Sequence, residues 1–233
     1  MKIELKNLKL ELNPGARIKL LGDSITHGVG GIGFEQNGEH IVAEFSRSPG
    51  AYCWAKLFKE YMQDKYSVNV INNACTGTKI EFVIEHFDTL VDKNDDLVIC
   101  TIGTNNRHFY KVNGDKPTRE QMLSAFSANI AKLREKFLST GKKFILIANI
   151  PALSANEKDA IDYWRVLHMC DINDAYKKAE SEYSFPFISL YDMMNEYCDK
   201  NGVRLDSLLC DGLHPNNKGY DVMFELIKTA LGV

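Results

Sequence analysis

Three residues that together can activate a hydroxyl group stand near the two ends of this chain. Ser24 follows an apolar run and a glycine, and Asp211 and His214 stand three positions apart far downstream. A serine hydroxyl is a weak nucleophile until a general base removes its proton, and an imidazole oriented by a carboxylate is the usual base. We therefore interpret Ser24 as a nucleophile, His214 as its base and Asp211 as the residue that orients the base.

Two further residues have the chemistry to stabilise the negative charge that such an attack creates. A tetrahedral intermediate needs preorganised donors, and a backbone N–H beside a glycine together with an asparagine amide can supply them. Gly77 and Asn105 each follow an apolar run that is typical of a strand. Ligands bind outside the carboxyl ends of parallel strands, so we expect Ser24, Gly77 and Asn105 to line one crevice.

Each of these residues also has a purely structural interpretation. Gly, Asp and Ser are common in ordinary turns, which could explain Ser24. A glycine after a strand is often needed only because the backbone there has a positive φ angle, and this explanation of Gly77 is compatible with a catalytic one. Asn105 could cap its own loop.

The elements that would position these residues alternate between strands and helices along the chain. Residues 2–12 alternate in polarity, which is typical of a strand pair or an edge strand and gives an N-terminal extension over residues 1–15. The expected strands are 17–21, 67–71, 96–101, 143–150 and 185–190, and the expected helices are 48–62, 80–91, 118–141, 156–183 and 216–231. This alternation predicts βαβ units, and hence a parallel sheet with helices on both faces.

Composition favours a single globular domain over residues 1–233. The chain is 45% hydrophobic and 25% charged, and its net charge of −3 comes without a long block of either sign, which argues against nucleic acid as a partner. No apolar run reaches the roughly 18 residues of a membrane span, so we expect a cytoplasmic protein without a membrane partner. The six cysteines are scattered without a C-x-x-C pair, which argues against a zinc site or a disulfide framework. We expect no metal and no cofactor.

Four short blocks contain the candidate residues. They read Leu-Gly-Asp-Ser-Ile-Thr at 21–26, Ala-Cys-Thr-Gly at 74–77, Gly-Thr-Asn-Asn at 103–106 and Asp-Gly-Leu-His-Pro at 211–215. In this order and spacing, the blocks resemble those of the SGNH hydrolases, also called GDSL-type esterases and lipases. Any one block is a weak signal, whereas all four together are specific, and the resemblance spans about residues 17–231.

The resemblance implies a flavodoxin-like three-layer α/β/α sandwich with a five-stranded parallel sheet. It implies Ser24, His214 and Asp211 as nucleophile, base and third member of a triad. It also implies an oxyanion hole made by the N–H groups of Ser24 and Gly77 and the side chain of Asn105. One position departs from the family pattern, because the third block usually ends in aspartate and here ends in Asn106. We interpret this change as a local hydrogen-bond substitution that leaves activity intact but could alter substrate fit or loop rigidity.

Four residues beside these blocks are candidate substrate contacts: Asp23, His27, Asn106 and His108. Asp23 adjoins the nucleophile and could equally hydrogen-bond its turn. His27 and His108 lie on the same loops as Ser24 and Asn105. His168 lies in the expected helix 156–183, where a packing role is favoured.

The function predicted from these features is a serine esterase that works through an acyl-enzyme. The glycine-rich polar segment 28–47, and the lack of a long apolar loop for a fatty chain, favour a short acyl group, acetyl above all, on a carbohydrate or another polar alcohol. The partner would be a small-molecule or oligosaccharide ester, and a homo-oligomer stays open. Two alternatives stay open as well: a lysophospholipase or acyl-thioesterase of the same superfamily, and a non-catalytic binding protein on the same fold.

Overall fold

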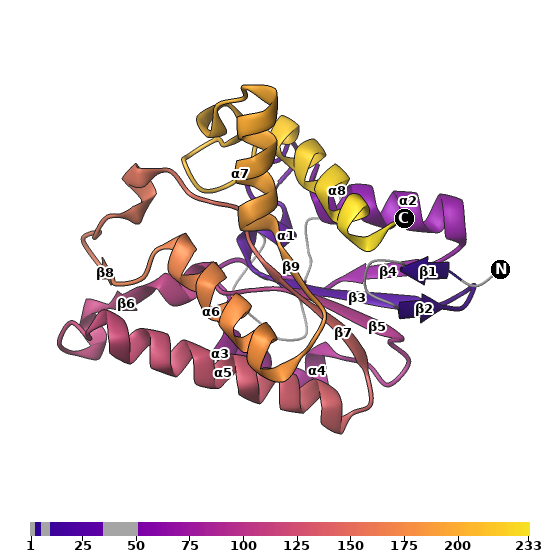
Figure 1. Cartoon of the computed structure of the whole chain (residues 1–233), viewed down its shortest axis with the longest axis horizontal. Coiled ribbons are helices and arrows are strands. Elements are labelled where there is room, and N and C mark those ends of the chain that lie inside the picture. Colours follow the sequence, from indigo (N-terminus) through magenta and orange to yellow (C-terminus); the bar gives the residue numbers. More distant parts are fainter. Residues whose placement is uncertain (1–2, 6–9, 35–50) are drawn as a thin grey trace.

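Five parallel strands form the central sheet of the chain, whose computed structural model describes residues 3–5, 10–34 and 51–233 (Figure 1). The strands are β3 (Arg17–Gly22), β4 (Asn69–Asn72), β5 (Leu97–Thr101), β7 (Lys143–Ala148) and β9 (Phe187–Ser189). Their order in the sheet is β4-β3-β5-β7-β9. Every residue of β5 is buried, as the apolar run that predicted this strand requires of a sheet covered on both faces.

The register brings the carboxyl ends of three neighbouring strands together. Gly22 at the end of β3 pairs with Thr101 at the end of β5, and Leu20 of β3 pairs with Asn72 at the end of β4. The three segments that leave these ends carry Ser24, Gly77 and Asn105 in turn. The sheet thus places the three predicted crevice residues on neighbouring connections.

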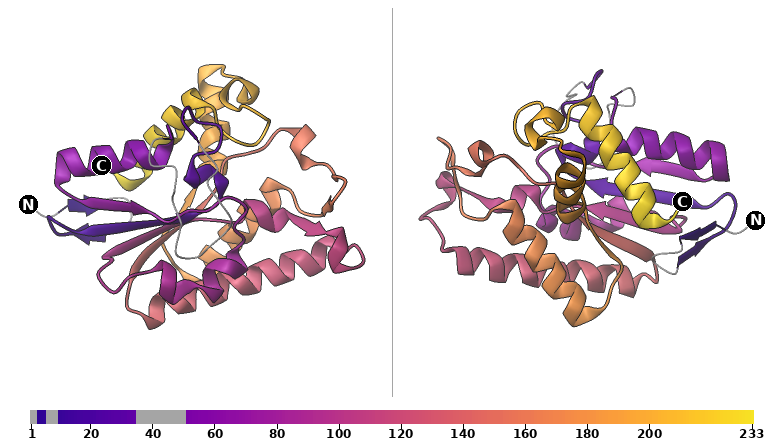
Figure 2. Two further views of the ribbon diagram at one scale, coloured as in Figure 1. Left: turned by 180° about the vertical axis from the view of Figure 1, so that it is seen from behind. Right: turned by 45° about the horizontal axis from the view of Figure 1, so that its top comes forward.

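Helices cover both faces of the sheet, which gives the predicted three-layer α/β/α sandwich (Figures 1 and 2). One face carries α2 (Trp54–Tyr66), α7 (Leu190–Asn201) and α8 (Asn217–Leu231), and the other carries α3 (Ile80–Glu85), α4 (Phe87–Leu90), α5 (Arg119–Ser139) and α6 (Met169–Tyr183). The shorter elements are α1 (Ser24–His27) and the 3₁₀ turns η3 (Thr104–Arg107), η4 (Lys111–Asn113), η5 (Ser154–Glu157) and η6 (Leu205–Leu208). Within the described ranges, every helix is too short or too polar to cross a lipid bilayer.

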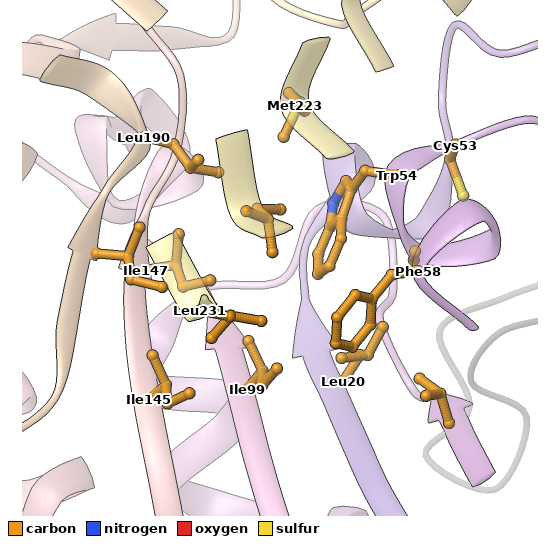
Figure 3. Packing of buried hydrophobic residues seen from close by; sticks show 14 of the residues in the cluster. Leu20, Cys53, Trp54, Phe58, Ile99, Ile145, Ile147, Leu190, Met223 and Leu231 are labelled. Atoms are coloured by element: carbon orange, nitrogen blue, oxygen red, sulfur yellow. The ribbon is translucent and has the colours of Figure 1, made fainter. Parts of the chain in front are cut away.

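Each helical layer packs on the sheet through its own hydrophobic cluster. In the first, Trp54 and Phe58 of α2 point toward Leu20 of β3 and are fully buried, while Met223 and Leu231 come down from α8 (Figure 3). Truncating a buried aromatic residue of this size to alanine typically costs about 3–5 kcal/mol. The aromatic residues along one face of α2 are therefore part of the core that packs on this face of the sheet, as their spacing predicted.

Two small antiparallel ribbons lie at opposite ends of the molecule. The pair β1 (Ile3–Leu5) and β2 (Leu10–Leu12) lies beside both termini, so residues 2–12 contain the strand pair that was one of the two expectations (Figure 1). The pair β6 (His108–Tyr110) and β8 (Tyr163–Arg165) lies at the far end, beyond the carboxyl ends of the central strands (Figure 1). We call this second pair the β6–β8 ribbon.

The β6–β8 ribbon shows that the predicted helix over 156–183 is wrong in its first half. Residues 163–165 pair with residues 108–110, and the Arg107 carbonyl accepts the N–H groups of Val166 and Leu167. Regular helix begins only at Met169, where His168 is the residue before α6 and donates its backbone N–H to Asp171. His168 is therefore a helix-start residue and does not lie within a helix.

The predicted start of the helix at Ser48 is also wrong. Cys53 is the N-cap of α2, and Ala51 and Tyr52 before it are not helical. The Tyr52 N–H donates to the Ile32 carbonyl at 2.9 Å, which ties this segment to the loop after α1 instead of to a helical turn. The proposed cap itself, at residues 48 and 49, lies outside the described residues.

Other boundaries were close to those expected. The segment 80–91 divides at His86 into α3 and α4, and the strands expected over 143–150 and 185–190 are shorter than predicted. The predicted capping box of α5 is present, with Thr118 and Gln121 each accepting the other's backbone N–H. Asn216 caps α8 as expected, by accepting the Gly219 N–H.

Candidate active site

Ser24 is the first residue of α1 and stands directly after the tight turn that ends β3. The Asp23 carboxylate caps α1 by accepting the Ile25 N–H at 3.0 Å. A Cβ on Gly22 would lie 2.6 Å from Thr26 Oγ1 and 2.8 Å from the Thr101 carbonyl oxygen, so only glycine fits this approach of the turn to β5. The turn leaves Ser24 4% exposed at the carboxyl edge of the sheet.

Two hydrogen bonds connect Ser24, His214 and Asp211 in a row. Ser24 Oγ lies 2.9 Å from His214 Nε2, and His214 Nδ1 lies 2.7 Å from Asp211 Oδ2. When Nδ1–H donates to the carboxylate, Nε2 of the neutral ring is left with its lone pair toward the serine hydroxyl. The arrangement has the geometry for taking a proton from Ser24.

Asp211 is held as a carboxylate by its own loop. Its second oxygen accepts the backbone N–H groups of Leu213 at 3.0 Å and His214 at 2.8 Å. Partial burial opposes ionisation, but the hydrogen bonds from the His214 side chain and from these two backbone groups outweigh it and lower the pKa of Asp211. The residue that would orient the imidazole therefore stays ionised.

The described start of the glycine-rich segment 28–47 packs directly on the loop over residues 210–215, which carries His214 and is here called the histidine loop. Gly30 has a φ of +92°, and a Cβ there would lie 2.4 Å from the Pro215 carbonyl oxygen and 2.8 Å from Cys210 Sγ. Tyr220 of α8 donates its hydroxyl to the carbonyl of Val29 at 2.7 Å, in the same segment. These contacts fix the Ser24 and His214 loops relative to each other. Residues 35–47 of the segment lie outside the described residues.

Gly77 lies on the connection after β4. This connection is bonded to the turn over residues 22–26 that carries the predicted nucleophile Ser24, here called the nucleophile turn. The Cys75 N–H donates to the Gly22 carbonyl at 3.0 Å, and Asn72 Nδ2 donates to the Thr26 carbonyl at 2.9 Å. Gly77 has a φ of +82°, so the structural explanation for a glycine here, namely that it adopts a positive φ angle, also holds. Burial raises the pKa of the Cys75 thiol, which keeps this neighbouring sulfur protonated and a poor nucleophile.

Asn105 lies in η3, and its amide joins the third block to the second. Its Nδ2 donates to the carbonyl of Thr78, the residue after Gly77, at 3.0 Å. A primary amide nitrogen carries two hydrogens, so this bond uses one of them. The structure thus joins Ser24, His214 and Asp211 by direct hydrogen bonds and brings Gly77 and Asn105 together through Thr78.

Residues 20–222 match the GDSL-like Lipase/Acylhydrolase family, which is most of the chain. The chain belongs to this family. Membership makes the protein a hydrolase of ester bonds and confirms the resemblance read from the four blocks. No curated protein sequence matches the chain significantly.

Solved structures similar to this GDSL-like hydrolase share its fold at low sequence identity. The α/β hydrolase LAE5 from the metagenome of Lake Arreo is 17% identical, with a TM-score of 0.68 over 95% of this chain and 97% of its own. A lipase/acylhydrolase from Enterococcus faecalis is 22% identical, with a TM-score of 0.64 over 93% and 96%. Axe2, an acetylxylan esterase from Geobacillus stearothermophilus, is 18% identical, with a TM-score of 0.65 over 95% and 97%.

Asp23 of this GDSL-like hydrolase is fully buried, so the structure gives it no exposed surface for the predicted substrate contact. Asn149 Nδ2 donates to Asp23 at 3.0 Å and to Thr104 Oγ1 at 2.7 Å, which links the nucleophile turn to η3. Burial raises the pKa of Asp23, although hydrogen bonds from Thr104 and Ile25 work in the opposite direction. Asn149 was not predicted from the sequence, although a polar residue at the end of an apolar strand is the same signal that pointed to Asn105.

Asn106 also serves a contact within the fold. Its Oδ1 accepts the Ile80 N–H at 3.1 Å at the start of α3, and its Nδ2 donates to Glu81 Oε2 at 2.7 Å. An aspartate at this position would face the Glu81 carboxylate without a hydrogen to donate. The departure from the family pattern is thus matched by the partner residue on α3, which agrees with its interpretation as a local hydrogen-bond substitution.

The two candidate histidines lie in different surroundings. His27 is largely buried, with Nδ1 3.0 Å from Thr76 Oγ1 and its ring edge-on to Phe34. His108 lines a cavity beside α5, and burial together with the charges of Lys79, Arg165 and Arg107 lowers its pKa to about 3. His108 is therefore neutral at ordinary pH.

Proposed function

We propose that this chain is a serine esterase that forms an acyl-enzyme on Ser24. The observation that carries the proposal is the unbroken row from Ser24 Oγ through His214 to Asp211 Oδ2, with distances of 2.9 and 2.7 Å. Both distances lie in the range that proton transfer requires of a general base and its orienting partner.

The reaction has two balanced halves. Ser24 Oγ attacks the ester carbonyl carbon while His214 Nε2 takes the hydroxyl proton, and the tetrahedral intermediate collapses by expelling the alcohol, which leaves with that proton. Water then attacks the acyl-enzyme, again giving its proton to His214. Collapse of the second intermediate releases the acid and returns the proton to Ser24 Oγ.

The negative charge of each intermediate would be stabilised by three donors. The Ser24 N–H opens a helix and so lacks a partner within that helix, and the Gly77 N–H and the second Asn105 Nδ2 hydrogen complete the set. The bond from Asn105 to Thr78 supports this assignment, because it orients the amide beside Gly77. Loss of one such donor typically lowers kcat by about 10²- to 10³-fold.

A similar fold supports the triad by analogy. Three structures of Axe2 are of catalytic mutants in which a serine, an aspartate or a histidine is replaced by alanine, and the aspartate and histidine stand three positions apart. Asp211 and His214 have the same spacing in this chain. By analogy, we assign Ser24, Asp211 and His214 as the catalytic serine, aspartate and histidine of this chain.

We propose a short acyl group, acetyl above all, on a carbohydrate or another polar alcohol as the substrate. The polar, glycine-rich composition of 28–47 supports this choice, as does the acetylxylan esterase activity that Axe2 is named for. A cavity beside Gly77, lined by both aromatic and charged residues, supports it further.

Hydrolysis of p-nitrophenyl acetate and of a long-chain p-nitrophenyl ester tests the proposal, each with the wild type and Ser24→Ala. The wild type should prefer the acetyl ester, and Ser24→Ala should lose turnover of both. Ester hydrolysis by Ser24→Ala at the wild-type rate would exclude Ser24 as the nucleophile. A preference of the wild type for the long chain would replace the acetyl proposal with a lysophospholipase or acyl-thioesterase, and inactivity on every ester would favour a binding protein.

A further inference from the structure

A cavity of about 450 Å³ starts at Gly77 and runs along α3 toward the β6–β8 ribbon. Gly77 and Thr78 line it from the connection after β4, and Tyr110 lines it from β6. Because Gly77 is the proposed oxyanion donor, an ester bound at Ser24 would have one of its substituents next to the part of the cavity that Gly77 lines. The cavity is therefore placed to bind the part of the substrate that does not react.

The walls of the cavity combine aromatic rings with charged groups. Phe82 and Tyr110 provide the rings, and Lys79, Glu81 and Glu85 provide an ammonium group and two carboxylates. A sugar ring matches this set, because its C–H faces pack on aromatic rings while its hydroxyls donate to carboxylates and accept from an ammonium group.

Tyr110 is held by its neighbours on the ribbon while its ring stays accessible. The ring meets His108 edge-on at 5.0 Å and Tyr163 edge-on at 6.2 Å, and 42% of the residue is exposed. Lys79 Nζ lies over this ring, 5.3 Å from its centre, and donates to the His108 carbonyl at 3.1 Å. The ammonium group is thus fixed over the ring with further hydrogens to offer a ligand. An aromatic side chain held in this way loses little conformational entropy when a ligand packs on it.

A second cavity of about 460 Å³ adjoins the first, since Lys79 and Glu81 line both. It extends past Asn106 and Phe109 toward α5. Two adjoining cavities of this size offer space for more than one sugar ring. An oligosaccharide fits them better than a monosaccharide ester does.

We propose that the cavity between Gly77 and Tyr110 is a subsite for a sugar ring of an acetylated oligosaccharide, with Tyr110 as its stacking platform. The proposal rests on the proposed function, since it assigns the non-reacting part of that substrate. Tyr110 sets the affinity for the sugar and takes no part in the chemistry at Ser24.

The test compares two substrates across three variants. Tyr110→Ala should lower kcat/KM for acetylated xylo-oligosaccharides by roughly tenfold through a higher KM, the effect of losing about one aromatic contact. Its turnover of p-nitrophenyl acetate should stay within about twofold of wild type. Tyr110→Phe keeps the ring and should behave as wild type on both substrates. Val112→Ala, at the exposed tip beyond the same strand and outside both cavities, is the matched control and should also behave as wild type.

Binding of the deacetylated xylo-oligosaccharide to Ser24→Ala, followed by calorimetry, tests the subsite without the reaction. Ser24→Ala should bind it, and Ser24→Ala/Tyr110→Ala should bind it roughly tenfold more weakly. Equal losses of Tyr110→Ala on both substrates, or no loss on either, overturn the subsite.

The two proposals fail separately. Binding that depends on Tyr110, in a protein that cleaves no ester, keeps the subsite and removes the esterase. Cleavage of p-nitrophenyl acetate through Ser24, without binding or deacetylation of the oligosaccharides, keeps the serine esterase and overturns the subsite.

Discussion

The nucleophile turn and the β6–β8 ribbon lie at the same end of the molecule but differ in burial and in bonding. Asp23 is fully buried and Ser24 nearly so, whereas Val112 and Ile161 at the tip of the ribbon are 86% and 87% exposed. The turn is fixed by hydrogen bonds to residues at the ends of two strands, β4 and β7, and the ribbon mainly by pairing of its own two strands. The difference suggests that the chemistry depends on the buried turn and the choice of substrate on the ribbon.

His214→Ala should have the largest effect, because Ser24 then has no base. We expect kcat for p-nitrophenyl acetate to fall by roughly 10⁵-fold or more. Residues that act as a unit are not additive, so Ser24→Ala/His214→Ala should be no slower than either single variant. Steady-state kinetics on the three proteins measures this, and a further loss in the double variant would show that the two side chains act independently.

Asp211→Asn should have a smaller effect. The variant keeps the shape of the side chain, but an amide no longer selects the His214 tautomer that carries its proton on Nδ1. We expect kcat to fall by about 10³- to 10⁴-fold. Circular dichroism should show unchanged folding, because half of this side chain is exposed. Activity close to wild type would mean that the hydrogen bond at 2.7 Å does not orient His214 for catalysis.

Asn106→Asp should destabilise the start of α3 by placing a second carboxylate against Glu81. We expect the free energy of unfolding to fall by about 1–3 kcal/mol, measured by urea denaturation. The double variant Asn106→Asp/Glu81→Gln restores a donor and should recover most of that loss. A stable single variant would contradict the pairing of these two residues.

Asp23→Asn should remove a pH dependence of stability that the wild type has. A buried carboxyl with a raised pKa binds a proton more tightly when folded, so wild-type stability should fall as the pH rises above about 4, the ordinary aspartate value, through the raised pKa. Asparagine at this position has no such proton. Unfolding free energies at several pH values for both proteins should therefore diverge, and parallel curves would show that Asp23 is not held in this way.

Trp164→Ala should have the smallest effect on the chemistry. Trp164 stacks on Phe109 across the ribbon, with ring centres 6.4 Å apart, and such a pair contributes about 0.5–1.5 kcal/mol. We expect the free energy of unfolding to fall by about 1 kcal/mol while kcat for p-nitrophenyl acetate stays within about twofold. A large loss of kcat would show that the ribbon also supports the nucleophile turn.

The same contrast explains what the sequence could predict. The central strands are runs of buried apolar residues, and Ser24, Gly77, Asn105 and the histidine loop occupy short blocks whose meaning does not depend on distant residues. Parallel pairing then brings the blocks together by the general rule for strand ends. The sheet, the three layers and the grouping of the site residues were therefore predictable.

The ribbon was not predictable, because its structure depends on residues far apart in the chain. Trp164 and His168 have helical spacing, and only the pairing of Tyr163–Arg165 with His108–Tyr110 shows that the first of them lies in a strand. The start of α2 was missed for a similar reason, because the bond from Tyr52 to Ile32 involves a distant loop. The contact between Asn106 and Glu81 likewise joins two connections that only the fold brings together.

Labelling with a p-nitrophenyl phosphonate is the most direct test of the central claim that His214 and Asp211 activate Ser24. Such a compound leaves a stable adduct on an activated serine, which peptide mass spectrometry locates. We predict a single adduct on Ser24 in the wild type and labelling slower by several orders of magnitude in His214→Ala. An adduct on another residue, or equally fast labelling of Ser24 without His214, would contradict the account.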